Sequence, residues 1–253
     1  MRDEFKKLGL SKKIVKKIGT AIFDFSMIRE GDKILVGLSG GKDSNLLLYS
    51  LCRLRRRSPL RFDVSALTID PADEQSDLGR LAEYAESLGV SFSVERYPIF
   101  RILEASQSKS PCSLCANIRR GMLASAAGAR KCNVLALGHH MDDAIETAMM
   151  NLLYAGRFRS FHPHIKMSRS GVRVIRPLIY VPEREIIEEN ELLGLPRVDF
   201  NCKYAATSQR ARVKDLIRDL SGKSRDIPGN IIHALKNCRE SDAWSEEVEH
   251  GFE

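Results

Sequence analysis

The sequence predicts an α/β fold, with a parallel sheet of five strands and helices on both faces. Five short segments have the composition of strands, and segments with apolar residues at helical spacing lie between them. Strands that alternate with helices form parallel sheets with right-handed crossovers, and ligands bind at the carboxyl ends of the strands. At 253 residues the chain can bury a substantial core, and it suits one large domain with appendages.

The predicted elements follow one another in a regular order. A first helix over residues 10–28 carries apolar residues at helical spacing and lysines on its other face. The predicted strands cover residues 33–38, 62–69, 91–96, 133–137 and 172–176. The predicted helices after the first cover residues 46–54, 73–88, 118–129, 142–154 and 182–193. We expect four parts: a basic amphipathic helix (1–30), the α/β domain (31–200), a C-terminal helical segment (201–238) and an acidic tail (239–253).

A glycine-rich turn follows the first predicted strand and has the sequence Ser39-Gly40-Gly41-Lys42-Asp43-Ser44. Strand, glycine turn and helix form the geometry in which backbone N–H groups and a helix N-terminus surround a phosphate. The two glycines allow close approach, Lys42 adds a positive charge, and Ser44 is a good N-cap. The turn is not a Walker A loop, because Val36 occupies the first glycine position and Asp43 follows the lysine. A turn without a ligand is the structural alternative.

The charge of the chain favours a polyanionic partner. Lys and Arg number 40 against 33 Asp and Glu, which gives a net charge of +7, and the pI is about 9.1. Basic residues cluster at the N-terminus, at Arg53–Arg61, at Arg119-Arg120 and in the Arg157–Arg159 segment. Each cluster also suits a solvated surface. The sequence shows no apolar run of membrane-span length and no signal-peptide core, so we expect a cytoplasmic protein that is not bound to membranes.

Six cysteines in a reducing compartment favour metal or redox chemistry over disulfides. Cys112 and Cys115 lie three residues apart at the start of a predicted helix, where both sulfurs share one side and thiolate is favoured. A thioredoxin-like dithiol would follow the first strand directly, and this pair comes later in the chain. A zinc site could add Cys202 and a histidine, whereas an iron–sulfur cluster would use Cys112, Cys115 and Cys202 and leave one iron open. The spacing alone favours zinc and the cluster equally, and Cys238 is the one rival to Cys202 as third ligand.

Several segments together resemble the tRNA 2-thiocytidine synthetase (TtcA) family of PP-loop ATP-pyrophosphatases. The glycine turn resembles the S-G-G-x-D-S loop of that superfamily. The segment Pro111–Gly121 is similar to the family's C-S-L-C-x-x-x-R-R-G motif. The segment Gly138-His-His-Met-Asp-Asp143, with Glu146, Thr147 and Asn151, is similar to its G-H-H-x-D-D block. The resemblance spans residues 10–238 and includes Arg176–Tyr180 and the Cys202 to Arg210 region.

The resemblance implies a Rossmann-like sheet and an ATP-dependent tRNA thiolase that uses Mg²⁺ and a 4Fe-4S cluster. Such an enzyme adenylates a base carbonyl oxygen, here C2 of an anticodon-loop cytidine, and replaces it with sulfur. The catalytic and metal residues implied are Lys42, Asp43 (Mg²⁺) and the cluster cysteines Cys112, Cys115 and Cys202. Residues implied to bind the nucleotide are Ser39, Gly40, Gly41, Lys42, Asp43, Ser44, Gly138, His140, Asp142 and Asp143. For His140 and Asp142, a packed imidazole and a helix cap are the structural alternatives.

The resemblance also implies binding partners. Two alternative functions stay open. The expected partners are tRNA, a sulfur donor such as a cysteine desulfurase, and a second copy of the chain in a homodimer. The chain departs from the family after Cys202, where Ala205 replaces the second cysteine of a C-x-x-C pair. The rivals are another PP-loop ligase of the lysidine synthetase type, which has no use for cluster cysteines, and a non-catalytic iron–sulfur sensor that binds RNA.

Overall fold

The structure of the chain is a computed structural model that describes residues 9–71, 77–106, 108, 111–198, 209–221 and 226–238. The described residues form two compact units. The first unit takes its residues from 1–143 and 162–208, and the second from 144–161 and 209–253. The predicted division at residues 30, 200 and 238 stays a prediction; the second unit includes residues 144–161 together with C-terminal residues. Cys202 and the acidic tail lie outside the described residues.

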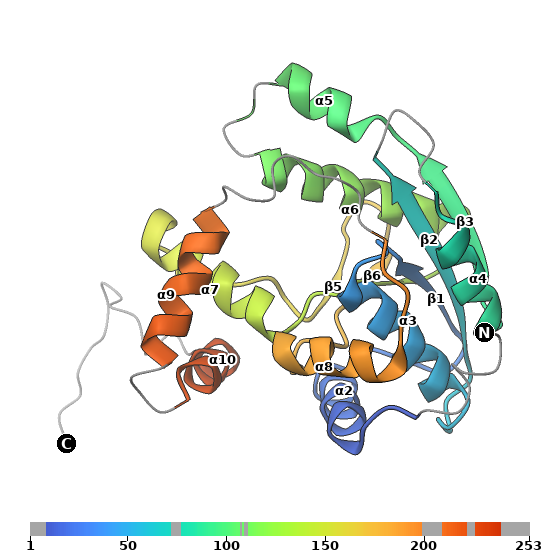
Figure 1. The fold of residues 1–253 in the computed structure, drawn as a ribbon, viewed down its shortest axis with the longest axis horizontal. Coiled ribbons are helices and arrows are strands. Elements are labelled where there is room, and N and C mark those ends of the chain that lie inside the picture. The colour runs from blue at the N-terminus through green and yellow to red at the C-terminus, as the bar shows by residue number, and fades with distance from the viewer. Residues whose placement is uncertain are drawn as a thin grey trace. The chain divides into compact units, whose positions relative to one another are not determined.

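The first unit contains a sheet of six strands in the order β3-β2-β1-β4-β6-β5 (Figure 1). The strands are β1 Asp32–Gly37, β2 Phe62–Asp70, β3 Ser91–Arg96, β4 Val134–Ala136, β5 His164–Lys166 and β6 Arg173–Ile175. The five predicted strands are confirmed and are parallel to one another. The count of five was wrong, because β5 joins β6 as an antiparallel edge strand. Two of its three residues are exposed, so they carry no apolar pattern that would indicate a strand.

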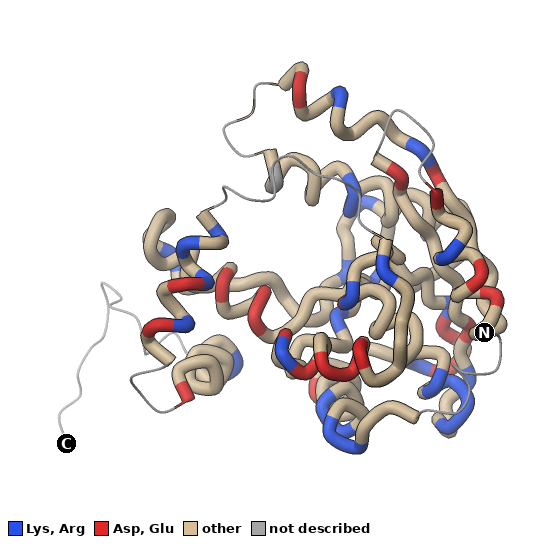
Figure 2. The backbone as a smooth tube through the Cα atoms, in the orientation of Figure 1, with Lys and Arg blue, Asp and Glu red and all other residues tan. Residues whose placement is uncertain are grey.

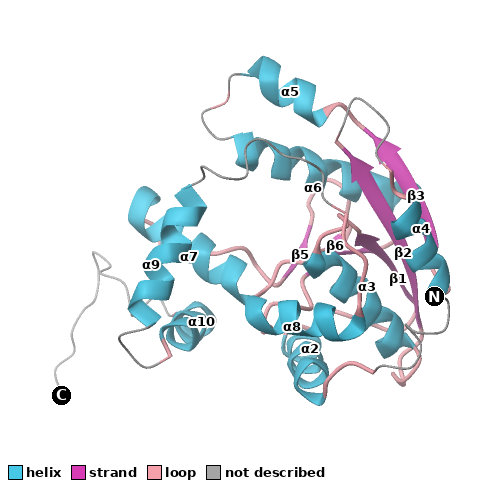
Figure 3. Cartoon of the chain, in the orientation of Figure 1, coloured by secondary structure: helices cyan, strands magenta, loops and turns pink. Residues whose placement is uncertain are grey.

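Helices α5 (Ile99–Ser106) and α6 (Pro111–Ala129) cover one face of this sheet (Figure 3). The core there joins Leu35, Leu67 and Leu135 of the strands to Leu103 of α5 and Leu123 of α6. Helix α5 was not predicted. Helix α6 begins at Pro111, seven residues before the predicted start at 118, and a proline suits the first helical position because it lacks the N–H that has no partner there.

Helices α2 (Lys12–Asp24), α3 (Lys42–Arg55) and α8 (Glu183–Leu193) lie on the other side of the sheet from α6 in Figure 1. Helix α3 is nearly enclosed from Ser44 to Cys52, whereas α2 buries a single apolar face. Two lysines of α2 form ion pairs with α8, because Lys13 and Lys17 lie 2.6 and 2.8 Å from Glu185. Helix α4 (Gly79–Ser87) packs beside β3 and ends near the predicted position.

The second unit contains most of α7 (Met141–Ala155), with α9 (Gln209–Ser221) and α10 (Ile227–Asn237). Arg210 of α9 donates to Glu146 and Thr147 of α7, at 3.2 and 3.3 Å, and Val213 of α9 is buried. The pair Glu146-Thr147 therefore holds α9 to α7. Among the described helices, none combines the length and the apolar character needed to cross a membrane.

Candidate active site at the carboxyl ends of the strands

The glycine turn connects the carboxyl end of β1 to the first turn of α3. The backbone N–H of Ser39 and its hydroxyl both donate to Ser44 Oγ, each at 3.1 Å, and Ser44 Oγ donates to the carbonyl of Gly41 at 3.0 Å. Gly41 is the N-cap of α3, so the prediction that Ser44 caps the helix was wrong. The Ser44 hydroxyl instead closes the turn from inside the first helical turn, where the backbone N–H groups of a helix have no partner in the helix.

Two glycines are required by this geometry. Gly40 has a φ of +77°, and an added Cβ would lie 2.9 Å from the carbonyl oxygen of Val198. Gly138 follows β4, and a Cβ added there would lie 3.0 Å from the backbone nitrogen of Ser44 and 3.1 Å from the carbonyl carbon of Asp43. Gly138 therefore lets the end of β4 contact the first turn of α3.

A buried side-chain amide, that of Asn45, forms hydrogen bonds that hold the glycine turn in place. The side chain of Asn45 is fully buried and donates to the carbonyls of Gly40, at 3.0 Å, and of Pro196. The hydroxyl of Tyr84 donates to the carbonyl of Asn45 at 2.9 Å, and Val198 N donates to the Gly40 carbonyl at 3.1 Å. Because each contact fixes the backbone, the turn is rigid before any ligand binds.

Lys42 is held by two carboxylates. Its ammonium lies 3.1 Å from Oδ1 of Asp43 and 3.1 Å from Oε1 of Glu183, at the start of α8. Burial lowers the pKa of Lys42, but the negative charges of Asp43 and Glu183 outweigh this effect, and the pKa is raised. For Asp43, burial raises the pKa, and the nearby His140 and Lys42 offset only part of that rise. Lys42 is thus fully charged near neutral pH.

His140 is buried at the end of β4 among three carboxylates. Its ring nitrogens lie 3.4 Å from Asp143, 3.7 Å from Asp142 and 3.8 Å from Asp43. Burial lowers the pKa of His140, but the three carboxylates together raise it. The backbone N–H of His140 donates to Asp143, and that of Glu183 donates to Asp142. His140 therefore organises the acidic groups at the end of the sheet.

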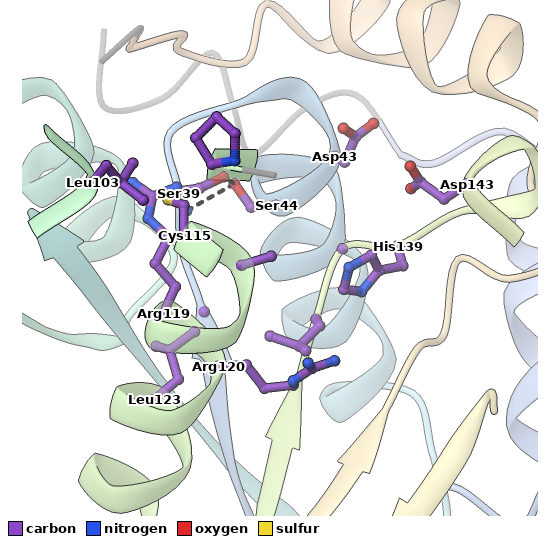
Figure 4. Close-up of a pocket in the computed structure, with 15 residues that line it drawn as sticks. Ser39, Asp43, Ser44, Leu103, Cys115, Arg119, Arg120, Leu123, His139 and Asp143 are labelled. Carbon is purple, nitrogen blue, oxygen red and sulfur yellow. Dashed lines mark hydrogen bonds between the residues drawn. The ribbon is translucent and has the colours of Figure 1, made fainter. Parts of the chain in front are cut away.

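A cavity of about 420 Å³ opens at this edge of the sheet within the first unit. It is lined by predicted residues from three elements, which are Ser39, Asp43, Ser44, Cys115, Gly138 and Asp143. Figure 4 shows Asp43 and Asp143 on one side of this cavity and Cys115 and Arg119 on another. The turn, two carboxylates and the partly buried thiol of Cys115 thus line one cavity.

Other predicted residues lie elsewhere or are not described. Gly40, Gly41, Lys42, His140 and Asp142 do not line the cavity, although Lys42 and His140 contact Asp43, which does. The backbone of Cys112 lies in α6, one turn before Cys115, but its side chain is outside the described part of the chain, as is Cys202. Within the described residues, no group of three His, Cys, Asp or Glu side chains is arranged to hold a metal ion.

Two residues that contact predicted or neighbouring site residues, Arg176 and Glu183, were not predicted as site residues from the sequence. Arg176, after β6, is 3 % exposed and donates from Nε to His139 Nδ1 at 3.3 Å and from an Nη to the His162 carbonyl at 2.6 Å. Burial, with the adjacent charge of Arg120, lowers the pKa of Arg176 to about 10. Because His139 accepts this bond at Nδ1, its ring proton lies on Nε2. Glu183 pairs with Lys42. Its position at the start of a helix was the only feature of the sequence that set it apart.

The fold and the turn define a class of protein: a PP-loop domain at the carboxyl edge of a parallel sheet. The family model described as the PP-loop domain matches residues 10–217. The chain is 37% identical over 242 residues to the tRNA-cytidine(32) 2-sulfurtransferase of Pelobacter propionicus, which covers 93% of this chain and 89% of that protein. It is also 37% identical over 237 residues to the protein of the same name from Burkholderia lata, covering 92% and 72%.

This chain therefore belongs to the tRNA-cytidine(32) 2-sulfurtransferase family of PP-loop proteins, and the resemblance to TtcA is confirmed. A solved structure has the same fold. The U34-tRNA thiolase NcsA from Methanococcus maripaludis, determined with its [4Fe-4S] cluster, superposes with a TM-score of 0.73 at 24% identity. The match covers 89% of this chain and 77% of that one.

Proposed function

We propose that this protein is an ATP-dependent tRNA sulfurtransferase. It adenylates the C2 carbonyl oxygen of an anticodon-loop cytidine and replaces that oxygen with sulfur, with release of AMP and pyrophosphate. The observation that carries the proposal is the cavity in which Ser39 and Ser44 of the turn meet Asp43, Asp143 and the thiol of Cys115. The proposal that the modified base is a cytidine and that the nucleic acid is tRNA comes from the names of the relatives.

The turn and the carboxylates suit the activation step. The C2 oxygen of cytidine is a poor leaving group, and transfer of AMP to it makes it a good one. Backbone N–H groups at the turn hold the phosphates, and Lys42 offsets charge that develops on pyrophosphate. The hydroxyls of Ser39 and Ser44 already form one hydrogen-bonded unit that phosphate oxygens can join.

Asp43 and Asp143 are the residues that would hold Mg²⁺. Asp43 Oδ1 is buried and accepts no hydrogen bond from the described residues, although Lys42 Nζ lies 3.1 Å away. A divalent cation prefers such carboxylate oxygens, and it would remove the cost of burying this charge. The residues present therefore fit the ion, which would neutralise phosphate charge during attack.

Cys112, Cys115 and Cys202 would hold a 4Fe-4S cluster. Cys115 faces the cavity that Asp43 and Ser39 also line, and Cys112 precedes it by one helical turn, so the described part of the set fits. A cluster held by these three cysteines would keep one iron open for inorganic sulfur. The protein's own part is to bring this position and the activated base into one cavity.

The remaining expectations belong to the same proposal. The protein acts in the cytoplasm as a homodimer and receives sulfur from a donor such as a cysteine desulfurase. The basic residues that line or flank the cavity, Arg119 and Arg120, contact the phosphates of the tRNA. The lysine-rich α2 and the Arg53–Arg61 cluster extend this contact, although Lys13 and Lys17 also pair with Glu185.

Anaerobic purification tests the proposal most simply. We expect iron and acid-labile sulfide in the wild-type protein, and 2-thiocytidine in tRNA incubated with it, ATP and sulfide. Cys115→Ser should abolish thiolation and keep ATP binding, whereas Cys238→Ser, at an exposed cysteine after α10, should retain both. Zinc without iron would favour a ligase of the lysidine synthetase type. Iron without AMP release would favour the RNA-binding sensor.

A further inference from the structure

The end of α7 and the segment after it expose a group of large side chains in the second unit. Tyr154 is 54% exposed and Phe158 is 41% exposed, and Leu152 and Leu153, which precede Tyr154 in the chain, are 44% and 51% exposed. Exposed apolar groups that lie together on a surface usually mark a contact with another molecule. No aspartate or glutamate occurs between residues 152 and 160, whereas arginines flank Phe158 on both sides.

Hydrogen bonds hold this segment in one shape. Gly156 has a φ of +61° and turns the chain back along α7. Asn151 then binds the segment twice, because its carbonyl accepts from Arg157 N at 3.0 Å and its side chain donates to the Arg159 carbonyl at 2.8 Å. Arg159 N donates to the Arg157 carbonyl at 3.1 Å, which makes Phe158 the central residue of a three-residue turn.

The rigid backbone matters because it leaves Phe158 partly exposed. Burial of an aromatic side chain is energetically favourable. The bonds from Asn151 nevertheless fix Phe158 at the apex of its turn, where it stays partly exposed. Ser160 adds a further bond, from its hydroxyl to the Ala144 carbonyl at 2.8 Å. A surface with preorganised aromatic rings loses little conformational entropy when a flat partner stacks on it.

The same unit carries positive charge on α9, where blue segments of the tube in Figure 2 mark the Lys and Arg positions. Arg212 and Lys214 of α9 are exposed, and Arg210 is held by Glu146. Aromatic rings interleaved with arginines are the arrangement that proteins use to bind single-stranded nucleic acid, in which bases stack on the rings and phosphates meet the cations.

We propose that Tyr154, Arg157, Phe158 and Arg159, together called the α7-end surface, bind unpaired nucleotides of the RNA substrate. Bases stack on Tyr154 and Phe158, and Arg157 and Arg159 contact the adjacent phosphates. This inference rests on the proposed function, because it assumes an RNA substrate. It assigns recognition of single-stranded RNA to the second unit, separately from the chemistry in the first.

The positive charge of the α7-end surface argues against a second copy of the chain as its binding partner. In a two-fold dimer the same patch lies on both sides of the interface. Arg157 and Arg159 of the two copies would then approach one another, and the segment offers no carboxylate to separate them. An RNA strand supplies the negative charge that this surface lacks, and its bases supply flat faces that can stack on Tyr154 and Phe158.

The test compares the affinity of the full-length protein for a fluorescent RNA hairpin with a seven-nucleotide loop and for a blunt RNA duplex. Tyr154→Ala/Phe158→Ala should weaken hairpin binding about 30-fold, since each stacked base contributes about 1–3 kcal/mol and 1.4 kcal/mol is tenfold. Arg157→Ala/Arg159→Ala should lower the slope of log affinity against log salt by about 1.4. Tyr97→Ala, at an aromatic side chain after β3 that is 40% exposed, is the matched control and should bind normally.

Further variants separate stacking from other contacts. Tyr154→Trp/Phe158→Trp should retain hairpin binding, whereas Tyr154→Leu/Phe158→Leu should lose it, because leucine has no face for a base. The proposal is overturned if the alanine pair binds the hairpin as wild type does. It is also overturned if the leucine pair binds normally while the alanine pair changes the mass measured by light scattering, since the surface would then be an interface between copies.

The two proposals fail in different ways. If the wild-type protein thiolates tRNA and the alanine pair does so with an unchanged KM for tRNA, the α7-end surface is wrong and the proposed function stands. If the wild-type protein binds the hairpin through Tyr154 and Phe158 but forms no 2-thiocytidine, the surface is right and the proposed function is wrong. If the wild-type protein binds neither the hairpin nor tRNA, both are wrong.

Discussion

Gly138→Ala tests whether the approach of β4 to the first turn of α3 shapes the nucleotide site. The new Cβ would lie 3.0 Å from Ser44 N and 3.1 Å from the Asp43 carbonyl carbon. Both neighbours are backbone atoms of a turn that Asn45 holds in place, so they cannot rotate away as a side chain could. The strand end or the turn must therefore move by a few tenths of an ångström.

The expected cost follows from other overpacked sites. Adding a methyl group to a tightly packed region destabilises proteins by about 1–3 kcal/mol. In a chain of this size we expect Tm to fall by about 2–10 °C. Because the displaced atoms belong to Asp43 and Ser44, ATP binding should weaken as well. Differential scanning fluorimetry and titration calorimetry with a non-hydrolysable ATP analogue measure the two effects.

Gly19→Ala is the matched control for this experiment. Gly19 lies inside α2, and nothing lies within 4 Å of the Cβ that alanine would add. Alanine is a better helix former, so this variant should gain about 0.5–1 kcal/mol and bind ATP normally. Wild-type stability together with wild-type ATP affinity in Gly138→Ala would refute the reasoning.

Further predictions concern the charged pairs. Glu183→Gln frees Lys42 from one of its two carboxylates and should tighten ATP binding about threefold, in line with about 0.5–1 kcal/mol for a partly exposed pair; weaker binding in calorimetry would contradict this role. Burial raises the pKa of Glu185, but Lys13 and Lys17 outweigh it and lower the pKa below its usual 4.5. Its stabilising contribution is therefore present above pH 4.5 and is lost as the pH falls through the lowered pKa. Urea unfolding at pH 3.5 and pH 7 should show a smaller loss of stability in Glu185→Gln than in the wild type, and equal losses would exclude this ion pair as a cause.

Local patterns predicted the part of the site that is continuous in sequence. The strand, the glycine turn and the first turn of α3 are adjacent, so composition and spacing were enough to predict a phosphate site. The acidic end of β4 was also recognised, because His140, Asp142 and Asp143 lie within four residues of one another. The five apolar strands followed from the same local reasoning.

Contacts between distant residues could not be predicted in this way. Glu183 reaches Lys42 across 141 residues, and Asn45 binds Pro196 across 151. Arg176 contacts His139 only because β6 lies beside β4 in the sheet. Strand β5 has three residues and lies at an edge, so it carries no strong periodic pattern, and helix α5 has only eight residues. These features depend on the order of strands, which spacing alone does not determine.

The central claim is that one cavity serves both the activation of a base by ATP and the delivery of sulfur at Cys115. The most direct measurement is a single-turnover reaction of the anaerobic, cluster-loaded protein with tRNA, ATP and sulfide, followed by quantification of AMP and 2-thiocytidine. We predict one AMP for each 2-thiocytidine in the wild type, and no 2-thiocytidine from Cys115→Ser. Wild-type thiolation by Cys115→Ser, or 2-thiocytidine without AMP, would contradict the account.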